Sequence, residues 1–333
     1  MHPSKPIVGR LAPSPTGGLH LGHARTFVIA WLAARSGGGR LVLRIEDIDA
    51  SRVRPGMVEA AMADLRWLGL NWDEGPDVGG PARPYLQSER LSLYQAALDR
   101  LKQQELVFPC TCTRAEISRM ASAPHVADGE PVYPGACRDR SAAEAELLQL
   151  SGRSFAWRFR VPPGKVAWSD LVQGDLELEP AQAGGDFLVG RSSGEPAYQL
   201  AVVVDDAAMG VTQVIRGDDL VSSTPRQLLL YKALGFVPPQ FGHIPLVHDS
   251  QGWRLAKRDQ AIKLSSLREA KVDPRRLVGW LAVSCGWSEN PQPCWPADWL
   301  GRCQPLSGLP VAPWILSHDV LTDLGLNAEH GRS

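Results

Sequence analysis

Two histidines follow a proline- and glycine-rich turn near the start of the chain and are candidates for binding phosphate. The segment reads Arg10-Leu-Ala-Pro-Ser-Pro-Thr-Gly-Gly-Leu-His20-Leu-Gly-His23. An apolar run precedes it and another follows, so a strand is expected to lead into a helix N-terminus, which favours anions. His20 and His23 would donate hydrogen bonds to a phosphate as its charge grows in a transition state. Gly22 would let an adenine or ribose approach the backbone. The bare spacing also fits a loop with two incidental histidines.

An acidic cluster follows the next apolar run, Leu41 to Ile45. Glu46, Asp47 and Asp49 stand where a strand is expected to end. Such a cluster can be a solvated strand end, a cap, a metal site or a ligand for an ammonium group. The spacing alone leaves these alternatives open.

A group of cysteines predicts a structural metal site. Cys110 and Cys112 are followed by Tyr133 and Cys137 in the pattern C-x-C and Y-x-x-x-C. Three thiolates and one further ligand form the closed tetrahedral site that structural zinc takes. From the residues alone, His125 competes with Tyr133 as the fourth ligand, and three reduced cysteines without metal are the alternative.

The elements that must position these residues are those of an α/β protein. A βαβ unit with parallel strands and a right-handed crossover is expected from strands at 7–12 and 41–45 and a helix at 23–35. The stretch at 108–140 is irregular and indicates an inserted subdomain. The pattern turns helical from residue 264 on. The other expected helices are 55–68, 88–104 and 224–234. The other expected strands are 154–161, 187–191, 198–204 and 211–216, with 187–191 and 198–204 forming a hairpin.

The composition indicates a globular protein of two or three domains. The chain has 333 residues, of which 44% are hydrophobic and 21% charged. Its 35 basic and 36 acidic residues argue against an evenly basic surface, although a local basic face is compatible with them. Six cysteines are too sparse for a disulfide scaffold. No apolar run reaches the ~20 residues that span a bilayer, and no signal peptide is visible, so a soluble cytoplasmic protein without membrane contact is expected.

The phosphate-binding segment resembles a signature of the class I aminoacyl-tRNA synthetases. Their HIGH box matches His20 to His23, and APSPTG, residues 12–17, is similar to the branch that uses glutamate and glutamine. Their second signature, KMSKS, is similar to residues 254–258, although Arg254 and Ala256 replace a lysine and a serine. The resemblance spans about residues 5–270. It implies a Rossmann-type catalytic domain that uses ATP with Mg²⁺.

The same resemblance assigns roles to individual residues. His20 and His23 would act on the phosphates, Gly22 would line the ATP site, and Lys257 would contact ATP from the second signature. LRIEDTD of the glutamyl-tRNA synthetases is similar to residues 43–49, and its glutamate, here Glu46, holds the amino group of the substrate. The two carboxylates of glutamate need cations, for which arginine offers a bidentate fork. The resemblance assigns to glutamate the residues Arg10, Ala12, Ser14, Glu46, Tyr198 and Arg216.

Within this branch the chain looks like the glutamyl-Q tRNA(Asp) synthetases, which lack a large anticodon-binding region. Their zinc site includes a tyrosine, so the resemblance implies Zn²⁺ held by Cys110, Cys112, Tyr133 and Cys137. The expected organisation is a split nucleotide-binding domain, an inserted tRNA-binding subdomain with a zinc site at 108–140, and a region that holds the KMSKS-like loop and a small helical module. These regions are 1–85 with 186–250, then 86–185, then 251–333.

The function implied by the resemblance is a two-step ligase reaction. The family activates glutamate with ATP and esterifies it onto the queuosine base at the wobble position of tRNA(Asp). The expected partners are therefore glutamate, ATP and tRNA(Asp), with no DNA. Two alternatives stay open: a truncated glutamyl-tRNA synthetase that charges tRNA(Glu), and a non-catalytic synthetase-like module that binds tRNA or an amino acid.

Overall fold

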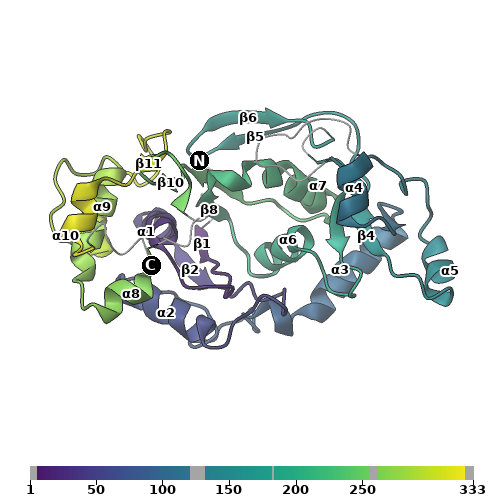
Figure 1. Ribbon diagram of the computed structural model, residues 1–333, viewed down its shortest axis with the longest axis horizontal. Helices are drawn as coiled ribbons and strands as arrows, with labels where there is room; N and C mark the ends of the chain where they lie inside the picture. Colours follow the sequence, from purple (N-terminus) through teal and green to yellow (C-terminus); the bar gives the residue numbers. More distant parts are fainter. Residues whose placement is uncertain (1–5, 121–131, 182–183, 256–261, 327–333) are drawn as a thin grey trace.

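The βαβ unit expected near the start of the chain is confirmed. The computed structural model describes residues 6–120, 132–181, 184–255 and 262–326. In it β1 (Val8–Leu11) and β2 (Arg40–Leu43) pair in parallel, and α1 (Leu21–Ser36) connects them (Figure 1). Every residue of β1 is buried, as expected for a parallel strand that is covered on both faces.

A second parallel pair lies beside the first. β8 (Gln213–Gly217) pairs with β9 (Gln240–Ile244), and η2 (Asp218–Ser223) and α7 (Thr224–Leu234) connect them. The N–H of Thr212 donates to the carbonyl of Val8 at 2.9 Å. Val8 begins β1 and Thr212 directly precedes β8, so the two strands begin side by side, and they remain in contact along their length. The carboxyl ends of four parallel strands therefore meet on one side, where ligands bind in α/β proteins.

The middle of the chain forms an antiparallel sheet at one end of the elongated molecule (Figure 1). Its strands are β3 (Val107–Cys110), β4 (Ala156–Phe159) and β7 (Phe187–Gly190), in the order β3-β4-β7. The helices before and within this region are η1 (Gln87–Glu89), α3 (Leu91–Gln103), α4 (Arg114–Met120) and α5 (Glu144–Leu150). The strand expected at 154–161 and the helix expected at 88–104 are thus confirmed.

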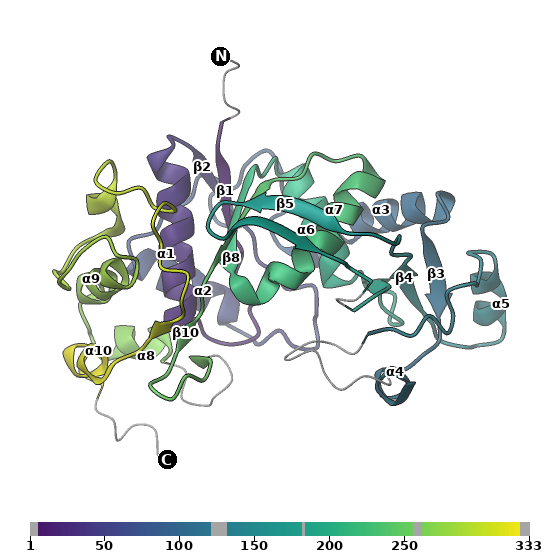
Figure 2. The same cartoon turned by 90° about the horizontal axis from the view of Figure 1, so that it is seen from above.

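An antiparallel hairpin that the sequence did not predict crosses back to the parallel strands. It consists of β5 (Val166–Asp170) and β6 (Gly174–Leu178). The N–H of Leu171 donates to the carbonyl of Phe241 in β9 at 2.8 Å. Figure 2 shows the hairpin alongside α7. Although it belongs to the range 86–185 that was expected to form the insertion, the hairpin packs on β9 and α7, and the domain boundaries stay a prediction.

The strand expected at 198–204 and its hairpin with 187–191 are both wrong, because this segment is the helix α6 (Tyr198–Ala208) and β7 pairs with β4. Its run of valines favours a strand by propensity. The helix is buried on several sides, from Leu200 to Asp206, so its apolar residues form a continuous run rather than a stripe. The helical spacing places Tyr198 and Asp205, seven residues apart, on one face.

The last part of the described chain packs on the outer side of α1. β10 (Val247–His248) pairs with β11 (Trp314–Ile315), and α8 packs against α2 (Met57–Trp67). The helices here are α8 (Leu264–Glu269), α9 (Pro274–Ser284), η4 (Pro296–Trp299) and α10 (His318–Asp323). The helical pattern expected after residue 264 is confirmed. Tryptophans of the tail, including Trp287 and Trp299, pack against the core that contains α1.

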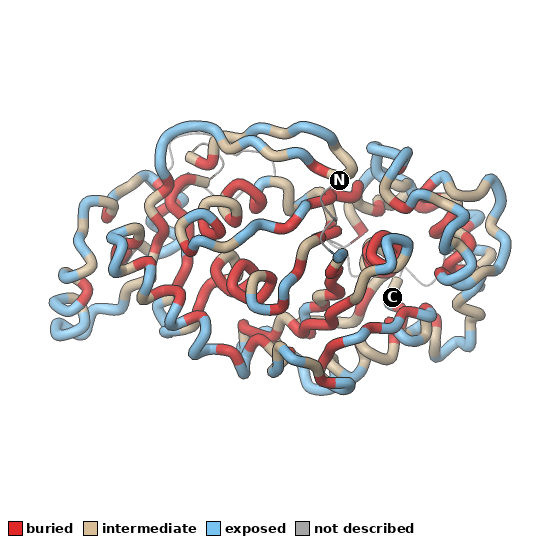
Figure 3. Tube along the Cα trace, turned by 180° about the vertical axis from the view of Figure 1, so that it is seen from behind, coloured by how far each residue is buried: buried red, intermediate tan, exposed pale blue. Residues whose placement is uncertain are grey.

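The buried residues run through the middle of the molecule and leave its outer loops exposed (Figure 3). One core joins α1 to the C-terminal helices, and a second joins α3, α6 and α7 to the strands. Among the residues that the structure describes, no helix has both the length and the apolar character needed to cross a membrane.

Candidate active site and metal centre

The two histidines of the first motif form the start of α1. His20 is the N-cap residue, and its Nδ1 accepts the N–H of Gly22 at 3.1 Å. The Nδ1 of His23 accepts the N–H of His20 at 3.2 Å, which completes a capping box. The rings stack with their centroids 3.7 Å apart. Because each Nδ1 accepts a backbone hydrogen, each neutral ring carries its proton on Nε2 and presents an N–H donor there.

Burial keeps both rings neutral. It lowers the pKa of His20 to about 4, and burial together with the neighbouring His20 lowers the pKa of His23 to about 3. Near pH 7 the pair therefore offers two neutral Nε2–H donors and no positive charge. This arrangement suits hydrogen bonding to a phosphate whose negative charge increases during reaction.

Gly22 has a structural reason for being glycine that the sequence did not reveal. A Cβ at this position would lie 3.0 Å from Cε1 and 3.1 Å from Nδ1 of His20. Any side chain would therefore crowd the ring that caps the helix. The expected approach of adenine or ribose to Gly22 stays a prediction.

The segment after the second motif lies directly beside the histidines. The N–H of Leu21 donates to the carbonyl of Ile262 at 3.1 Å, and the N–H of Leu264 donates to Leu19 at 2.8 Å. Arg254, the first residue of the second motif, forms an ion pair with Asp219 at 2.5 Å. Lys257 itself lies outside the described residues.

Arg10 and Glu46 belong to a buried network of charges. Fully buried Arg44 contacts Glu46 at 3.0 Å and Asp206 at 2.6 Å, and Arg10 lies 3.4 Å from Asp206. Asp205, the next residue of α6, binds Arg90 at 2.6 Å. Arg44 thus contacts the Glu46 carboxylate from one side. Asp205 and Asp206 of α6 supply the carboxylates that pair with the arginines of the network.

Arg216 is a buried cation whose recorded partners are all neutral. It is 4% exposed at the end of β8. It donates from Nε to His243 at 3.0 Å, from Nη1 to Gln227 at 2.8 Å, and from Nη2 to Thr224 at 2.8 Å. The carbonyl of Leu220 accepts a longer bond from Nη2, 3.4 Å. Within the described chain no carboxylate forms an ion pair with this guanidinium, and one Nη1 hydrogen has no recorded bond.

Tyr198 stands between these charges at the start of α6. Burial is the main cause that raises the pKa of its hydroxyl, and the nearby Glu46 raises it further, while Arg216 and Arg10 act in the opposite direction. The phenol therefore stays protonated and available as a hydrogen-bond donor. The same charges show that Tyr198, Glu46, Arg10 and Arg216 come together.

Ala12 and Ser14 lie in the turn that follows β1. The N–H of Glu46 donates to the carbonyl of Pro13 at 3.0 Å, so the turn runs alongside the acidic segment. Ala12 is half-buried and Ser14 is exposed. Among the residues that the structure describes, their side chains form no hydrogen bond with the charged residues, and their predicted role in binding glutamate stays a prediction.

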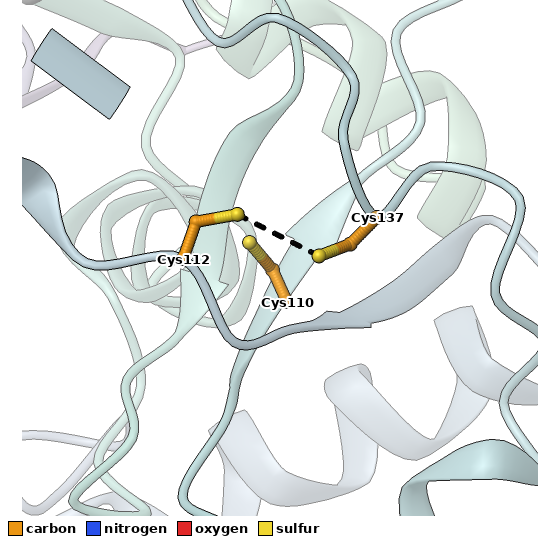
Figure 4. Close-up of side chains that lie close together, drawn as sticks. All are labelled: Cys110, Cys112 and Cys137. Atoms are coloured by element: carbon orange, nitrogen blue, oxygen red, sulfur yellow. Dashed lines mark hydrogen bonds between the residues drawn. The ribbon is translucent and has the colours of Figure 1, made fainter. Parts of the chain in front are cut away.

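The cysteines of the insertion converge on one point (Figure 4). The Sγ atoms of Cys110, Cys112 and Cys137 all lie within 4.8 Å of one another, and those of Cys112 and Cys137 are 3.6 Å apart. The hydroxyl oxygen of Tyr133 lies 3.5 Å from Sγ of Cys110 and accepts the N–H of Cys137 at 2.7 Å. His125 lies outside the described residues.

These distances fit a tetrahedral metal ion. With Zn–S near 2.3 Å and Zn–O near 2.0 Å, neighbouring ligands are expected roughly 3.5–3.8 Å apart. Nε of Arg158 lies 3.4 Å from Sγ of Cys110, and its guanidinium stacks on the ring of Tyr133. A buried arginine beside the cluster would offset the negative charge of several thiolates. The three thiols could hold a metal ion, and the donor set suits a structural one.

Some residues around Arg216 and Arg44 were missed in the sequence. Asp205 and Asp206 end an apolar run, and two acids in such a run signal buried cationic partners. Asp170, Thr224, Gln227 and His243 stand in separate elements and carry no shared spacing. Only the fold brings them to Arg216.

The sequence is similar to those of known proteins. A sequence family described as the catalytic domain of class I tRNA synthetases (E and Q) matches residues 6–297. A glutamyl-Q tRNA(Asp) synthetase of Symbiobacterium thermophilum is 52% identical over 88% of this chain and 90% of that protein. Another, of Nitratidesulfovibrio vulgaris, is 49% identical over 96% of this chain and 98% of the relative.

The fold also matches a solved structure. A glutamate-tRNA synthetase of Elizabethkingia anophelis superposes with a TM-score of 0.82 at 27% identity. The match covers 96% of this chain but 70% of that protein. The chain thus corresponds over nearly its whole length to part of a longer enzyme.

Proposed function

The chain belongs to the class I tRNA synthetase family of the E and Q type, and on this premise we propose that it activates glutamate with ATP and transfers it to the queuosine base of tRNA(Asp). The match extends over nearly the full length of relatives with the name glutamyl-Q tRNA(Asp) synthetase. The reaction is an ATP-dependent ligation that releases pyrophosphate and AMP.

The observation that carries the choice of substrate is the partner set of Arg216. A buried guanidinium with only neutral partners among the described residues suits the binding of an anionic group. Beside it lie Arg10, the carboxylate of Glu46 and the hydroxyl of Tyr198. Arg10 and Arg216 complement the two carboxylates of glutamate, and Glu46 complements its ammonium group, while Asp206 is held by Arg44 and Arg10.

Glutamine would fit this pocket poorly. Its neutral side-chain amide has the size of a carboxylate but supplies no negative charge to the guanidinium. A buried site loses much of its binding energy when a charged group is left unpaired. For the guanidinium of Arg216 to form two hydrogen bonds to the substrate carboxylate, Nη2 must give up its long bond to the carbonyl of Leu220 and donate to the substrate instead.

In the activation step, a carboxylate oxygen of glutamate attacks the α-phosphorus of ATP. The new P–O bond forms as the bond to the β-phosphate breaks, and pyrophosphate leaves with the electron pair. His20 and His23 donate Nε2–H bonds to the phosphates, and Lys257 draws charge from the pyrophosphate. Mg²⁺ accompanies ATP as part of the substrate. Because the nucleophile is already a carboxylate, the step needs positioning and charge stabilisation but no general base.

The role proposed for zinc is structural. Cys110, Cys112, Cys137 and Tyr133 would hold it, and the ion would stiffen a segment that has little core of its own. No bond of the substrate is made or broken there. The nearby residues Arg158 and Thr111 would keep the thiolates oriented.

Glutamate-dependent exchange between ATP and labelled pyrophosphate tests the proposal. We expect exchange with glutamate and far weaker exchange with glutamine or aspartate. Absence of exchange with glutamate, both with and without tRNA(Asp), would refute the proposed activation and favour a non-catalytic module that binds tRNA or an amino acid. Charging assays with tRNA(Glu) beside tRNA(Asp) then identify the acceptor.

A further inference from the structure

A chain of three buried side chains leads from the β5–β6 hairpin to the glutamate pocket. Oδ2 of Asp170 lies 2.5 Å from Nδ1 of His243, and Nε2 of the same ring accepts Nε–H of Arg216 at 3.0 Å. The side chains of Asp170 and His243 are fully buried. Neither residue takes part in the chemistry described above.

The hydrogen bonds define the protonation state of the ring. The guanidinium of Arg216 carries a proton on Nε at any physiological pH, so Nε2 of His243 must be the acceptor. Burial is the main cause that lowers the pKa of His243, which is therefore neutral near pH 7 with its single proton on Nδ1. That proton is donated to Asp170.

Asp170 is itself fixed by the backbone. Its Oδ1 accepts the N–H groups of Val172 and Gln173 at 3.0 Å each and of His243 at 3.1 Å. Three donors on one oxygen hold the carboxylate in one orientation, so Oδ2 faces the ring. The hairpin turn therefore holds in place the acceptor for the Nδ1 proton of His243.

We propose that Asp170 and His243 are positioning residues that orient Arg216 for glutamate, and thereby set the enzyme's preference for a side-chain carboxylate. This inference rests on the proposed function. The neutral ring fixes the plane of the guanidinium through Nε. The ring also keeps Asp170 away from Arg216. A direct ion pair between the two would neutralise the guanidinium with a carboxylate of the protein. The positive charge stays available to the substrate.

We call the hydrogen-bonded series Asp170–His243–Arg216 the relay. Asp170→Asn tests it with a minimal change in shape. The amide oxygen keeps the three backbone bonds, which fixes the NH₂ group toward the ring. An NH₂ group cannot accept the Nδ1 proton, so His243 must move its proton to Nε2. This proton can be donated to Thr224, whose hydroxyl lies 3.1 Å away. The Nε–H of Arg216 is then left without an acceptor, which in a buried site costs enough to weaken binding roughly tenfold to a hundredfold.

The expected kinetic result is selective. In pyrophosphate exchange, Asp170→Asn should raise the KM for glutamate by roughly tenfold or more and leave the KM for ATP within about twofold. The discrimination between glutamate and glutamine should fall in parallel. The matched control is Asp64→Asn, which alters another buried carboxylate, in α2, bonded to Arg268 of α8. It should change stability and leave the KM for glutamate unchanged.

His243→Gln provides the rescue. A glutamine side chain places an amide oxygen near the position of Nε2 and can accept the Arg216 proton, while His243→Leu cannot. We expect the glutamine variant to keep a lower KM for glutamate than the leucine variant. In the His243→Gln background, Asp170→Asn should have little further effect, because no imidazole proton remains to move. An equal increase of KM in both backgrounds would overturn the relay.

A readout without substrate separates this inference from the proposed function. In protein labelled with ¹⁵N-histidine, the signals lost in His243→Gln identify the ring. They should report the Nδ1–H tautomer in the wild type and the Nε2–H tautomer in Asp170→Asn. An unchanged tautomer contradicts the relay even if the enzyme is active. Absent exchange in the wild type, with the tautomer switch observed, would instead refute the proposed function alone.

Discussion

The rings of His20 and His23 stack with their centroids 3.7 Å apart, and each Nδ1 accepts a backbone N–H at the start of α1. The histidine pair therefore has two roles: it caps the helix and presents two Nε2–H donors. A substitution of His20 can separate these roles, because asparagine is also a good N-cap residue but has no counterpart of the Nε2–H donor.

Replacement of His20 should lower the rate of glutamate activation. His20→Asn keeps an oxygen that can accept the N–H of Gly22, so the fold should stay stable, while His20→Ala should cost about 1 kcal/mol of stability. Both variants lose the Nε2–H donor, and kcat for pyrophosphate exchange should fall roughly 10²–10³-fold. Exchange kinetics and urea unfolding check the two effects. Activity of His20→Asn at the wild-type level would remove this residue from the mechanism.

The stability of the protein should fall as the pH is lowered from about 6.5 towards 4. His20 and His23 have folded-state pKa values of about 4 and 3, below the 6.5 of an unperturbed histidine. Between these values the unfolded chain binds protons that the folded protein excludes, so acid favours unfolding, whereas above pH 6.5 the effect vanishes. Each ring contributes up to about 1.4 kcal/mol per pH unit. Urea unfolding as a function of pH measures the slope, which should be smaller in His20→Asn. An identical slope in both proteins would contradict the assigned pKa.

Arg216 should control the affinity for glutamate. Arg216→Ala removes a buried cation that faces the substrate carboxylate, and the KM for glutamate should rise roughly 30-fold or more. Arg216→Lys keeps the charge but loses the fork, so it should remain strongly impaired. Steady-state exchange kinetics give both values. The exposed Arg275, which pairs with Asp273, provides the control Arg275→Ala without effect. An unchanged KM for glutamate in Arg216→Ala would refute the role of this residue.

The sequence predicted the parts of the site whose residues are close together in the chain. His20 and His23 stand in one turn, and Cys110, Cys112 and Cys137 stand in one segment, so their spacing made them candidates for phosphate and metal binding, and the resemblance to a known family favoured these roles over the alternatives. The βαβ unit and α7 were also predicted, because Pro and Gly punctuation and apolar runs mark their ends.

The rest depended on contacts between distant segments. The run from Tyr198 to Val204 reads as a strand, and only its burial among α3, α7 and the strands explains why it is helical. Asp170 and His243 are separated by 73 residues and meet because an unpredicted hairpin packs on β9. No local pattern marks such a pair.

The metal centre should contain zinc in a one-to-one ratio. Cys110→Ser removes one ligand of the closed site, and the purified variant should lose the metal and some stability. Cys294→Ser changes a cysteine outside the cluster and should retain zinc. Tyr133→Phe removes only the phenol oxygen and should weaken zinc retention if that oxygen is the fourth ligand. Elemental analysis gives the ratios, and metal-free wild-type protein would eliminate the site.

The acceptor of glutamate is the central point of the proposed function. The direct measurement is the transfer of labelled glutamate to tRNA(Asp) that carries queuosine, beside the same tRNA that lacks only this base. We predict labelling of the queuosine-containing tRNA alone, with no labelling of tRNA(Glu). Equal labelling of both forms of tRNA(Asp), or charging of tRNA(Glu) in their place, would contradict it.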